Sequence, residues 1–481
     1  MAYRRLETLP LDWTLIFKKM SYKSTFNILI AFVSLTVILI STSCRKFIEV
    51  PAPANSITSD QIFVDSVNAT SAINGIYINM MNNGFSIGFA NASTTLFGGM
   101  AADELDNPTN TPNYKEYFAN AITPTNAANV TFWNNIYTYL YEANACIEGA
   151  AASTTLEQSV KNRVTGEAKF LRAFYHFYLM NLYGTAPLVT TTDYNITSRL
   201  PKATRAELSA QIMADLNDAL QLLNGDRAAI NKSRVNRFAV SALLARVNLY
   251  QQQWAAAEAA ATTVINANYK LEPSLNNVFL TGNQEQIWQM TPVAPGLETT
   301  EGQTIIPAAP TLVPSFVVTN ALLNAYETGD QRKVNWLKSV TIGANTYTYP
   351  FKYKLVRDNN TAPREAYSVL RLAEQYLIRA EARAQQSNLT GATADLNAIR
   401  NRAGLANTTA SGQPELLNAI QRERRVELAC EWGHRWLDLK RTQTADAVLG
   451  GKPNWKSTAV LFPIPNAQLL LNPFLTQNPG Y

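Results

Sequence analysis

Histidine, cysteine and charge are all scarce in this chain. Its 481 residues include 2 His and 3 Cys, and charged residues make up 16% of the total. Two histidines cannot build a multi-His metal centre, and three cysteines cannot form a four-Cys zinc site or a disulfide framework. A formal net charge of +5 over this length is too weak for a nucleic-acid-binding protein, which needs a strongly basic face. We therefore expect no metal, no cofactor and no nucleic acid.

The remaining composition is that of a folded protein. Hydrophobic residues are 47% of the chain, which is typical of globular proteins and excludes a disordered or collagen-like chain. The length exceeds one ordinary core of about 150 residues. We therefore expect two or more subdomains, or a repeat array.

The N-terminal region predicts export. Residues 26–40 are almost wholly apolar but shorter than the roughly 20 residues of a bilayer span, which suits the hydrophobic part of a signal peptide. Lys18, Lys19 and Lys23 supply its basic part. Met20 begins a leader of normal length and is an alternative start. Small residues then precede Cys44, a pattern that resembles a bacterial lipobox. The alternative is a plain signal anchor with an incidental cysteine.

These features divide the start of the chain. We predict a lipoprotein signal peptide over residues 1–43, Cys44 as the lipid anchor, and an extended tether over residues 44–57 with two prolines. Removal of the leader takes away five basic and only two acidic residues, so the mature chain is nearly neutral.

The mature chain is predominantly helical in pattern. Apolar spacing predicts helices, and an Asn-, Thr-, Gly- and Pro-rich stretch over residues 82–131 predicts a loop. The expected helices span 58–81, 132–151, 156–183, 205–223, 237–250 and 254–266.

Two helical pairs share small residues at the positions where helices would meet. In residues 237–266 these include Ala242, Ala245, Ala257 and Ala260, and a second pair spans residues 374–405. Close approach through small residues is the physical basis of tetratricopeptide-type (TPR) hairpins. Gly404 is expected to cap the last helix of the second pair. Ordinary alanine-rich helices without a repeat relation are the alternative.

The fold class follows from these patterns. Residues 284–365 contain many Pro, Gly and Thr residues with short apolar runs, which predicts short strands and long loops. We expect a mainly α-helical protein, in which a TPR-like hairpin scaffold carries a loop-rich inserted subdomain with short strands.

Four segments together resemble the SusD/RagB family of surface lipoproteins from the nutrient-uptake systems of Bacteroidetes. They are GEAKFLRAFYHFYLMNLYGTAPLV (166–189), the pair ending NANYKL (237–271), LRLAEQYLIRAEA…LNAIRNRAGL (370–405), and IQRERRVELACEWGHRWLDLKR (420–441) with the terminal LFPIPNAQLLLNPFLTQNPGY. The resemblance covers essentially the whole mature chain. It implies an N-terminal helical region over 58–283, an insert over 284–365 and a C-terminal region over 366–481.

The resemblance also implies a function. Family members are held in the outer membrane by acyl chains, face the cell exterior, capture a nutrient that is usually an oligosaccharide, and cap a SusC-like TonB-dependent transporter. On this reading the protein is not an enzyme. The alternatives are a surface glycoside hydrolase and a TPR-type adaptor that binds peptides.

A column of carboxylates is the strongest candidate for catalysis. Glu423, Glu427 and Glu431 recur every four residues and would share one face of a helix. Paired carboxylates could act as a glycosidase acid and nucleophile. Because arginines and an aspartate follow at helical spacing, we favour a structural motif of ion pairs made with Arg424, Arg435 and Asp438.

Other reactive side chains have a structural interpretation. His176 and His434 lie in helical motifs without a nucleophile pattern, and Cys146 and Cys430 are expected to be buried thiols, although one disulfide is possible. Calcium binding by Asp103, Glu104 and Asp106 is conceivable, but their spacing is no EF-hand.

Loop aromatics are the candidates for glycan binding, because aromatic faces stack on sugar rings and neighbouring amides orient hydroxyl groups. Two groups lie near asparagines in the predicted loops: Tyr114 and Tyr117 with Phe118, and Trp336 with Tyr347 and Tyr349.

Overall fold

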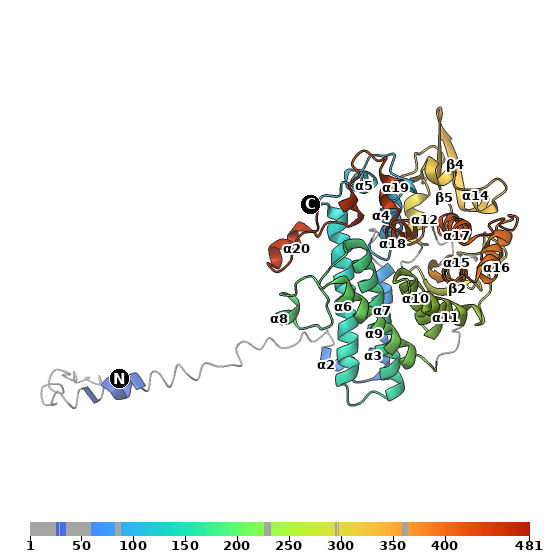
Figure 1. Ribbon diagram of the computed structural model, residues 1–481. Coiled ribbons are helices and arrows are strands. Elements are labelled where there is room, and N and C mark those ends of the chain that lie inside the picture. Colours follow the sequence, from blue (N-terminus) through green and yellow to red (C-terminus); the bar gives the residue numbers. More distant parts are fainter. Residues whose placement is uncertain are drawn as a thin grey trace, which may run out of the picture. The chain divides into compact units, whose positions relative to one another are not determined.

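The computed structural model describes residues 26–27, 29–34, 59–81, 88–225, 232–293, 296, 298–357 and 364–481 (Figure 1). Residues 1–58 and 59–481 are separate units, and the description below concerns the second. The described residues between 26 and 34 are helical. Cys44, the predicted tether and most of the predicted signal peptide lie outside the described residues.

Long antiparallel helices form the N-terminal part of the fold. The central one, α7, lies between α6 and α9, and α3 packs against both α6 and α7 (Figure 1). From Val164 onward nearly every residue of α7 is buried. The bounds are α2 Ser59–Ile62, α3 Ser66–Met81, α6 Ala127–Ala152, α7 Gln158–Tyr183, α8 Tyr194–Thr197 and α9 Arg205–Leu222.

Local signals set the ends of these helices. Thr204 and Glu207 form a capping box at the start of α9, in which each side chain satisfies a backbone N–H of the other residue. After α7, Gly184 has a φ of 81°, a left-handed conformation that favours glycine and ends the helix.

The two predicted hairpins are present and lie against each other. They are formed by α10 (Arg237–Tyr250) with α11 (Trp254–Ile265), and by α15 (Leu372–Gln385) with α16 (Leu389–Arg402). Helix α11 packs on α15, so segments more than 100 residues apart become neighbours. The shared core contains Ala245, Leu249, Ala257, Ala261, Ile378 and Ala382. Gly404 follows α16 with a φ of 78°, as predicted for a capping glycine.

Two predictions about the first part of the mature chain are wrong in detail. The helix expected over 58–81 is interrupted between α2 and α3, where Asp65 instead accepts hydrogen bonds from the backbone of Val67 and Asn68. The stretch 82–131, predicted as loop, contains α4 (Ser93–Ala101) and α5 (Pro112–Phe118). Helix α4 is buried along its whole length, so its sequence has no polar face to reveal a helical period.

Within the described residues, the strands form three two-stranded antiparallel sheets. Strand β2, inside the predicted insert, pairs with β6 at the start of the predicted C-terminal region and also contacts α10. The strands are β1 Leu105–Asp106 with β3 Val317–Val318, β2 Gln286–Met290 with β6 Tyr367–Arg371, and β4 Leu337–Ile342 with β5 Asn345–Pro350.

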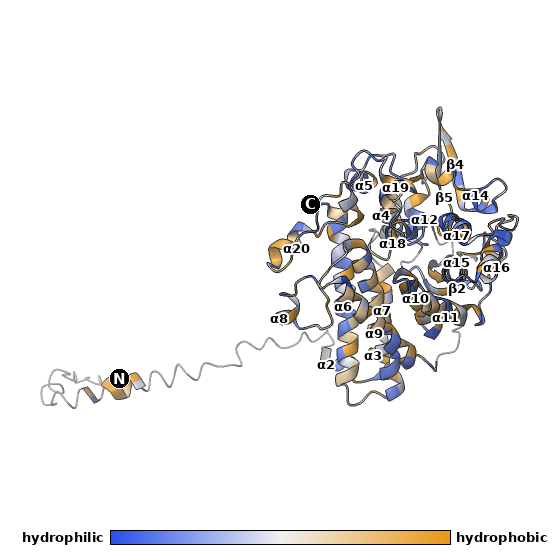
Figure 2. Cartoon of the chain, viewed as in Figure 1, coloured by the Kyte–Doolittle hydropathy of each residue, from blue (hydrophilic) through white to orange (hydrophobic). Residues whose placement is uncertain are grey.

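Short helices complete the insert and the C-terminal part. In Figure 2, α20 is mostly hydrophobic, and its Leu470 and Leu471 are exposed. Helix α17 is mostly hydrophilic in the same view, yet many of its charged residues are buried. The bounds are α12 Thr300–Ile305, α13 Asn320–Leu323, α14 Gln331–Trp336, α17 Gln413–Glu427, α18 His434–Arg441, α19 Ala445–Leu449, η4 Ser457–Val460 and α20 Asn466–Leu471.

Among the helices that the structure describes, none combines the length and the apolar character needed to cross a membrane.

Candidate functional site

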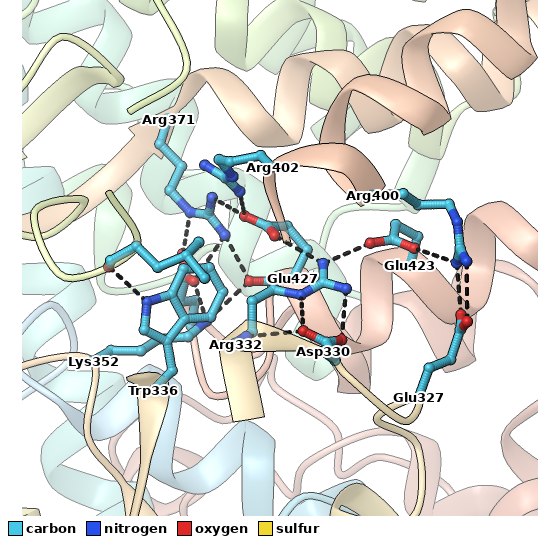
Figure 3. Close-up of polar contacts among 12 residues, drawn as sticks. Glu327, Asp330, Arg332, Trp336, Lys352, Arg371, Arg400, Arg402, Glu423 and Glu427 are labelled. Carbon is cyan, nitrogen blue, oxygen red and sulfur yellow. Dashed lines mark hydrogen bonds and ion pairs between the residues drawn. The ribbon is translucent and has the colours of Figure 1, made fainter. Parts of the chain in front are cut away.

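Glu427, the last residue of α17, lies at the centre of a buried cluster of charges (Figure 3). Its Oε2 accepts a hydrogen bond from Arg332 Nη1 at 3.0 Å, and its Oε1 accepts one from Arg371 Nη1 at 2.6 Å. Arg402 donates to the same Oε1. These arginines come from α14, β6 and α16, so one carboxylate joins four elements.

The neighbouring carboxylates extend the cluster. Glu423 accepts from Arg332 at 2.6 Å and from Arg400 at 3.3 Å, and Arg400 also reaches Glu327 at the exposed edge. Further pairs join Glu431 to Arg371 and Lys352, Glu285 to Arg371 and Arg402, and Asp330 to Arg332. We call this set the charge cluster. Its buried carboxylates are matched by as many cations, which is the condition under which charges can be buried at moderate cost.

Trp336 forms one wall of the charge cluster. Lys352 Nζ lies 4.5 Å from the centroid of its ring, and the guanidinium groups of Arg371 and Arg402 lie at 5.9 and 6.0 Å. The indole N–H donates to the carbonyl oxygen of Leu275 at 2.9 Å. The ring therefore stabilises cations through its electron-rich face.

The electrostatics of the cluster do not suit acid–base catalysis. Burial alone would raise the pKa of Glu427, but the charges of the surrounding arginines hold it well below its usual range. The pKa of Glu431 is likewise lowered by Arg371 and Lys352 against the effect of burial. A glycosidase needs one carboxyl group with a raised pKa in contact with substrate. Only Glu423 of the three has a raised pKa, caused mainly by burial, and it is 2% exposed.

The predicted single helical column of carboxylates is wrong. Helix α17 ends at Glu427, and a turn follows in which Cys430, Trp432 and Gly433 have φ values of 52°, 47° and 68°. Glu431 lies in this turn and reaches the cluster from there. The turn packs directly on α4, since a Cβ on Gly98 would lie 2.6 Å from the Cα of Gly433.

The ion-pair partners also differ from those expected. Arg424 pairs with Asp438 across the turn at 3.0 Å, and Asp438 also binds Arg441. Arg435 binds Asp103 instead of a glutamate of the column. The partners of the glutamates are distant in sequence, and nothing in the sequence marks those cations as buried.

The remaining reactive side chains are enclosed. Burial lowers the pKa of His176 to about 3, and that of His434 is also well below its usual range, chiefly through burial. Cys146 and Cys430 are buried free thiols, and burial raises the pKa of Cys146 to about 12. A thiol so hard to ionise is a poor nucleophile.

The acidic residues proposed for calcium are held apart by separate partners. Asp103 binds Arg425 and Arg435, whereas Asp106 binds Lys115 at 2.7 Å. Glu104 is buried, and burial together with the charge of Asp103 raises its pKa to about 8. In the described part of the chain no three His, Cys, Asp or Glu side chains are placed to hold a metal ion.

Three of the five aromatic residues predicted to bind glycans are buried, and the prediction is wrong for them. Tyr117 and Trp336 are 0% exposed and Tyr349 is 3% exposed, so no sugar can stack on their rings. Tyr117 stacks on Phe97 with 4.3 Å between ring centroids. Tyr114 and Tyr347 are partly exposed and stay candidates.

Tyr114, on α5, lies beside the point where a polar loop meets a proline-rich and largely apolar segment. The pairing of β1 with β3 brings the loop after Asp106 beside the proline-rich segment before Val317. The ring of Tyr114 lies 5.3 Å from that of Phe316, and Asn107 Nδ2 donates to the carbonyl oxygen of Ser315 at 2.6 Å. An aromatic ring is thus held rigidly among amides and charged groups.

Two family models together match residues 46–481. A model described as the SusD family matches residues 209–481, and one described as starch-binding and associating with the outer membrane matches residues 46–249. The chain belongs to the SusD family. The resemblance of the sequence to SusD/RagB proteins and the predicted mainly helical fold are therefore confirmed.

The chain is similar to other SusD-like proteins over most of its length and over nearly all of theirs. SusD-like protein P2 of Formosa agariphila is 26% identical, over 96% of this chain and 99% of its own. A SusD superfamily protein from Bacteroides vulgatus has the same fold, with a TM-score of 0.76, 20% identity and coverage of 87% and 100%. A laminarin-binding SusD-like protein has a TM-score of 0.71, 26% identity and coverage of 86% and 99%.

Replacement of Glu427 tests the structural role of the charge cluster. The variant Glu427→Gln leaves three buried arginines without a charged partner at this position, so we expect a loss of about 3–5 kcal/mol in the free energy of unfolding. Urea denaturation measures it.

Glu327→Gln is the matched control, because the Glu327 side chain is 54% exposed and its pair with Arg400 lies at the surface. We expect a change of about 0–1 kcal/mol there. A loss of only about 0–1 kcal/mol in Glu427→Gln as well would show that the buried part of the cluster does not stabilise the fold.

Proposed function

We propose that the protein is a surface receptor that binds an oligosaccharide without cleaving it, and that it caps a SusC-like TonB-dependent transporter during uptake. Family membership over residues 46–481 carries the proposal. Further support comes from the 26% identity to a protein that binds laminarin. His, Cys and metal-ligand patterns are scarce in this chain, and a protein that captures a nutrient without catalysis does not need them.

The location that we propose is the outer face of the outer membrane. The apolar leader followed by Cys44 predicts export and lipidation at that cysteine. One acyl chain binds a membrane only weakly, and stable anchoring needs at least two. Bacterial lipoproteins carry three, which suffices to hold the mature chain at the membrane.

The binding surface that we propose surrounds Tyr114. Its ring is fixed by Phe316 from one side, while Lys115 and Asp106 form an ion pair at 2.7 Å beside it. Fixed aromatic rings lose little conformational entropy on binding, and charged groups at the edge can donate or accept hydrogen bonds to sugar hydroxyls. Tyr347, on the hairpin of β4 and β5, is a second candidate.

Hydrolysis at the carboxylates of α17 is the less favoured alternative. Glu423, Glu427 and Glu431 are buried and already bound by arginine or lysine, so a sugar could reach them only if the charge cluster opened. Binding without turnover needs no such opening.

Titration calorimetry with laminarin and a panel of other soluble glycans tests the receptor role. We expect binding of at least one glycan, no release of reducing ends, and an affinity about two- to tenfold weaker in Tyr114→Ala, as loss of one aromatic contact worth about 0.5–1.5 kcal/mol predicts. Tyr141→Ala, which removes an exposed tyrosine of α6, is the control and should bind normally. Failure to bind any glycan would contradict the receptor role.

Co-purification tests the transporter partnership. The tagged protein, extracted in mild detergent from its native outer membrane, should bring down a large β-barrel protein, whereas Cys44→Ala should not reach that membrane stably. Repeated recovery without any barrel would contradict the role as a lid.

A further inference from the structure

A pocket of about 480 Å³ lies away from Tyr114 and was not foreseen from the sequence. The loop between α5 and α6 (residues 120–124), the loop between α19 and η4, and the last two residues, Gly480 and Tyr481, form its walls. The volume lies within the range of small-molecule sites. Neither Tyr114 nor any member of the charge cluster lines it.

Two of these walls are fixed to the same point of the core. Asn120 Nδ2 donates to the carbonyl oxygen of Ala101, the last residue of α4, at 2.8 Å. Lys452 Nζ donates to that oxygen at 3.3 Å and to the carbonyl oxygens of Met100 and Ala102 at 2.9 and 2.6 Å. The positive charge of Lys452 suits the end of a helix, where unpaired carbonyl groups gather. The two loops therefore hold a constant spacing.

The aromatic rings of the pocket are fixed at their polar ends. Trp455 Nε1 donates to Asp446 Oδ1 at 2.8 Å, and its ring meets Trp436 edge to face at 6.2 Å. The hydroxyl group of Tyr481 donates to the carbonyl oxygen of Leu461 at 2.8 Å. Both rings stay partly exposed. Flat apolar faces are thus presented with little rotational freedom left to lose.

Glycine is required at the edge of this pocket. Gly480 has a φ of 96°, and a Cβ there would lie 2.3 Å from the Oγ1 of Thr458. The close approach of these two segments positions Tyr481 as a wall.

Asn120 is a buried residue of the pocket lining. It is 5% exposed, and its side-chain amide is turned to the core through the hydrogen bond to Ala101. Its φ of 53° shows that the backbone holds this asparagine in an uncommon conformation. Around the rim, Asn454, Lys456 and Thr458 are exposed and add further polar groups.

We infer that this pocket, here called the Trp455 pocket, is a second carbohydrate site that takes one sugar ring. Fixed aromatic faces suit the apolar face of a pyranose, and the exposed Asn454, Lys456 and Thr458 of the rim suit its hydroxyl groups. The inference rests on the proposed function, since it assumes that the protein handles glycans. It adds a contact that is independent of Tyr114.

Fluorine NMR of the mature protein labelled with 5-fluorotryptophan tests this inference. The Trp455 signal is assigned by its absence in Trp455→Phe. The probes are the methyl glycosides of glucose, galactose, mannose and xylose, each added to saturation. At least one should shift the Trp455 signal while the signal of buried Trp288 stays in place.

A blocking variant complements the labelled protein. Ala121 lines the pocket from an exposed position, so Ala121→Trp should fill the space without disturbing the core, and should weaken the binding of the active glycoside at least fivefold. Tyr141→Ala, an exposed position outside both proposed sites, should leave this binding unchanged.

The two proposals fail differently. If laminarin or another glycan binds but no glycoside shifts the Trp455 signal, or if Ala121→Trp binds normally, the Trp455 pocket is not a sugar site and the receptor role stands. If no glycan and no glycoside binds, both proposals are overturned.

Discussion

The carboxylate of Glu427 is the point at which α14, β6 and α16 are joined to α17. It is fully buried and bound by arginines from α14, β6 and α16, which approach α17 from different parts of the chain. Ions are costly to bury, and the cost is offset only where every charge has a close and well-oriented partner. The arrangement therefore has few alternatives, because moving any one of these elements would leave a charge unpaired in the interior.

This constraint explains how a hydrophilic helix can be part of the core. Helix α17 carries many charged residues, and an ordinary amphipathic helix would turn them to water. Here Trp336 closes one side of the charge cluster, and Lys352 and the arginines lie over its ring. The interior is thus polar where α14, β6 and α16 meet α17 and apolar where the hairpins stack through alanines. We propose that the ligand is bound by loops at the surface of this interior.

Much of the helical scaffold could be predicted from the sequence. The bounds of α10 agree with the expected 237–250, and two of the predicted small residues, Ala245 and Ala257, lie in the core that the hairpins share. These features are local, since helical spacing and capping glycines act within a few residues. The sequence predicts Glu431 on the same helix as Glu427 and does not reveal the break between α17 and α18. The break depends on left-handed φ values at Cys430 and Trp432, and these residue types rarely adopt that conformation.

The candidate site was predicted less well, because burial is a property of the whole fold. Trp336 sits in a segment that reads as loop, and the sequence does not reveal that cations cover its ring. The glutamates were correctly singled out as a group, but their partners lie 25 to 95 residues away in sequence for Glu427. Asn120, Trp455 and Tyr481 are brought together only by the tertiary structure, and Trp455 between Asn454 and Lys456 was the one local sign of their pocket.

Hydrogen exchange measured by mass spectrometry in Glu427→Gln tests the central claim, that one buried carboxylate couples these elements. The claim predicts faster exchange together in residues 331–336, 367–373, 398–402 and 423–431, with α7 unchanged, because the first three segments lose the same charged partner, which the fourth segment carries. Faster exchange confined to residues 423–431 would contradict it.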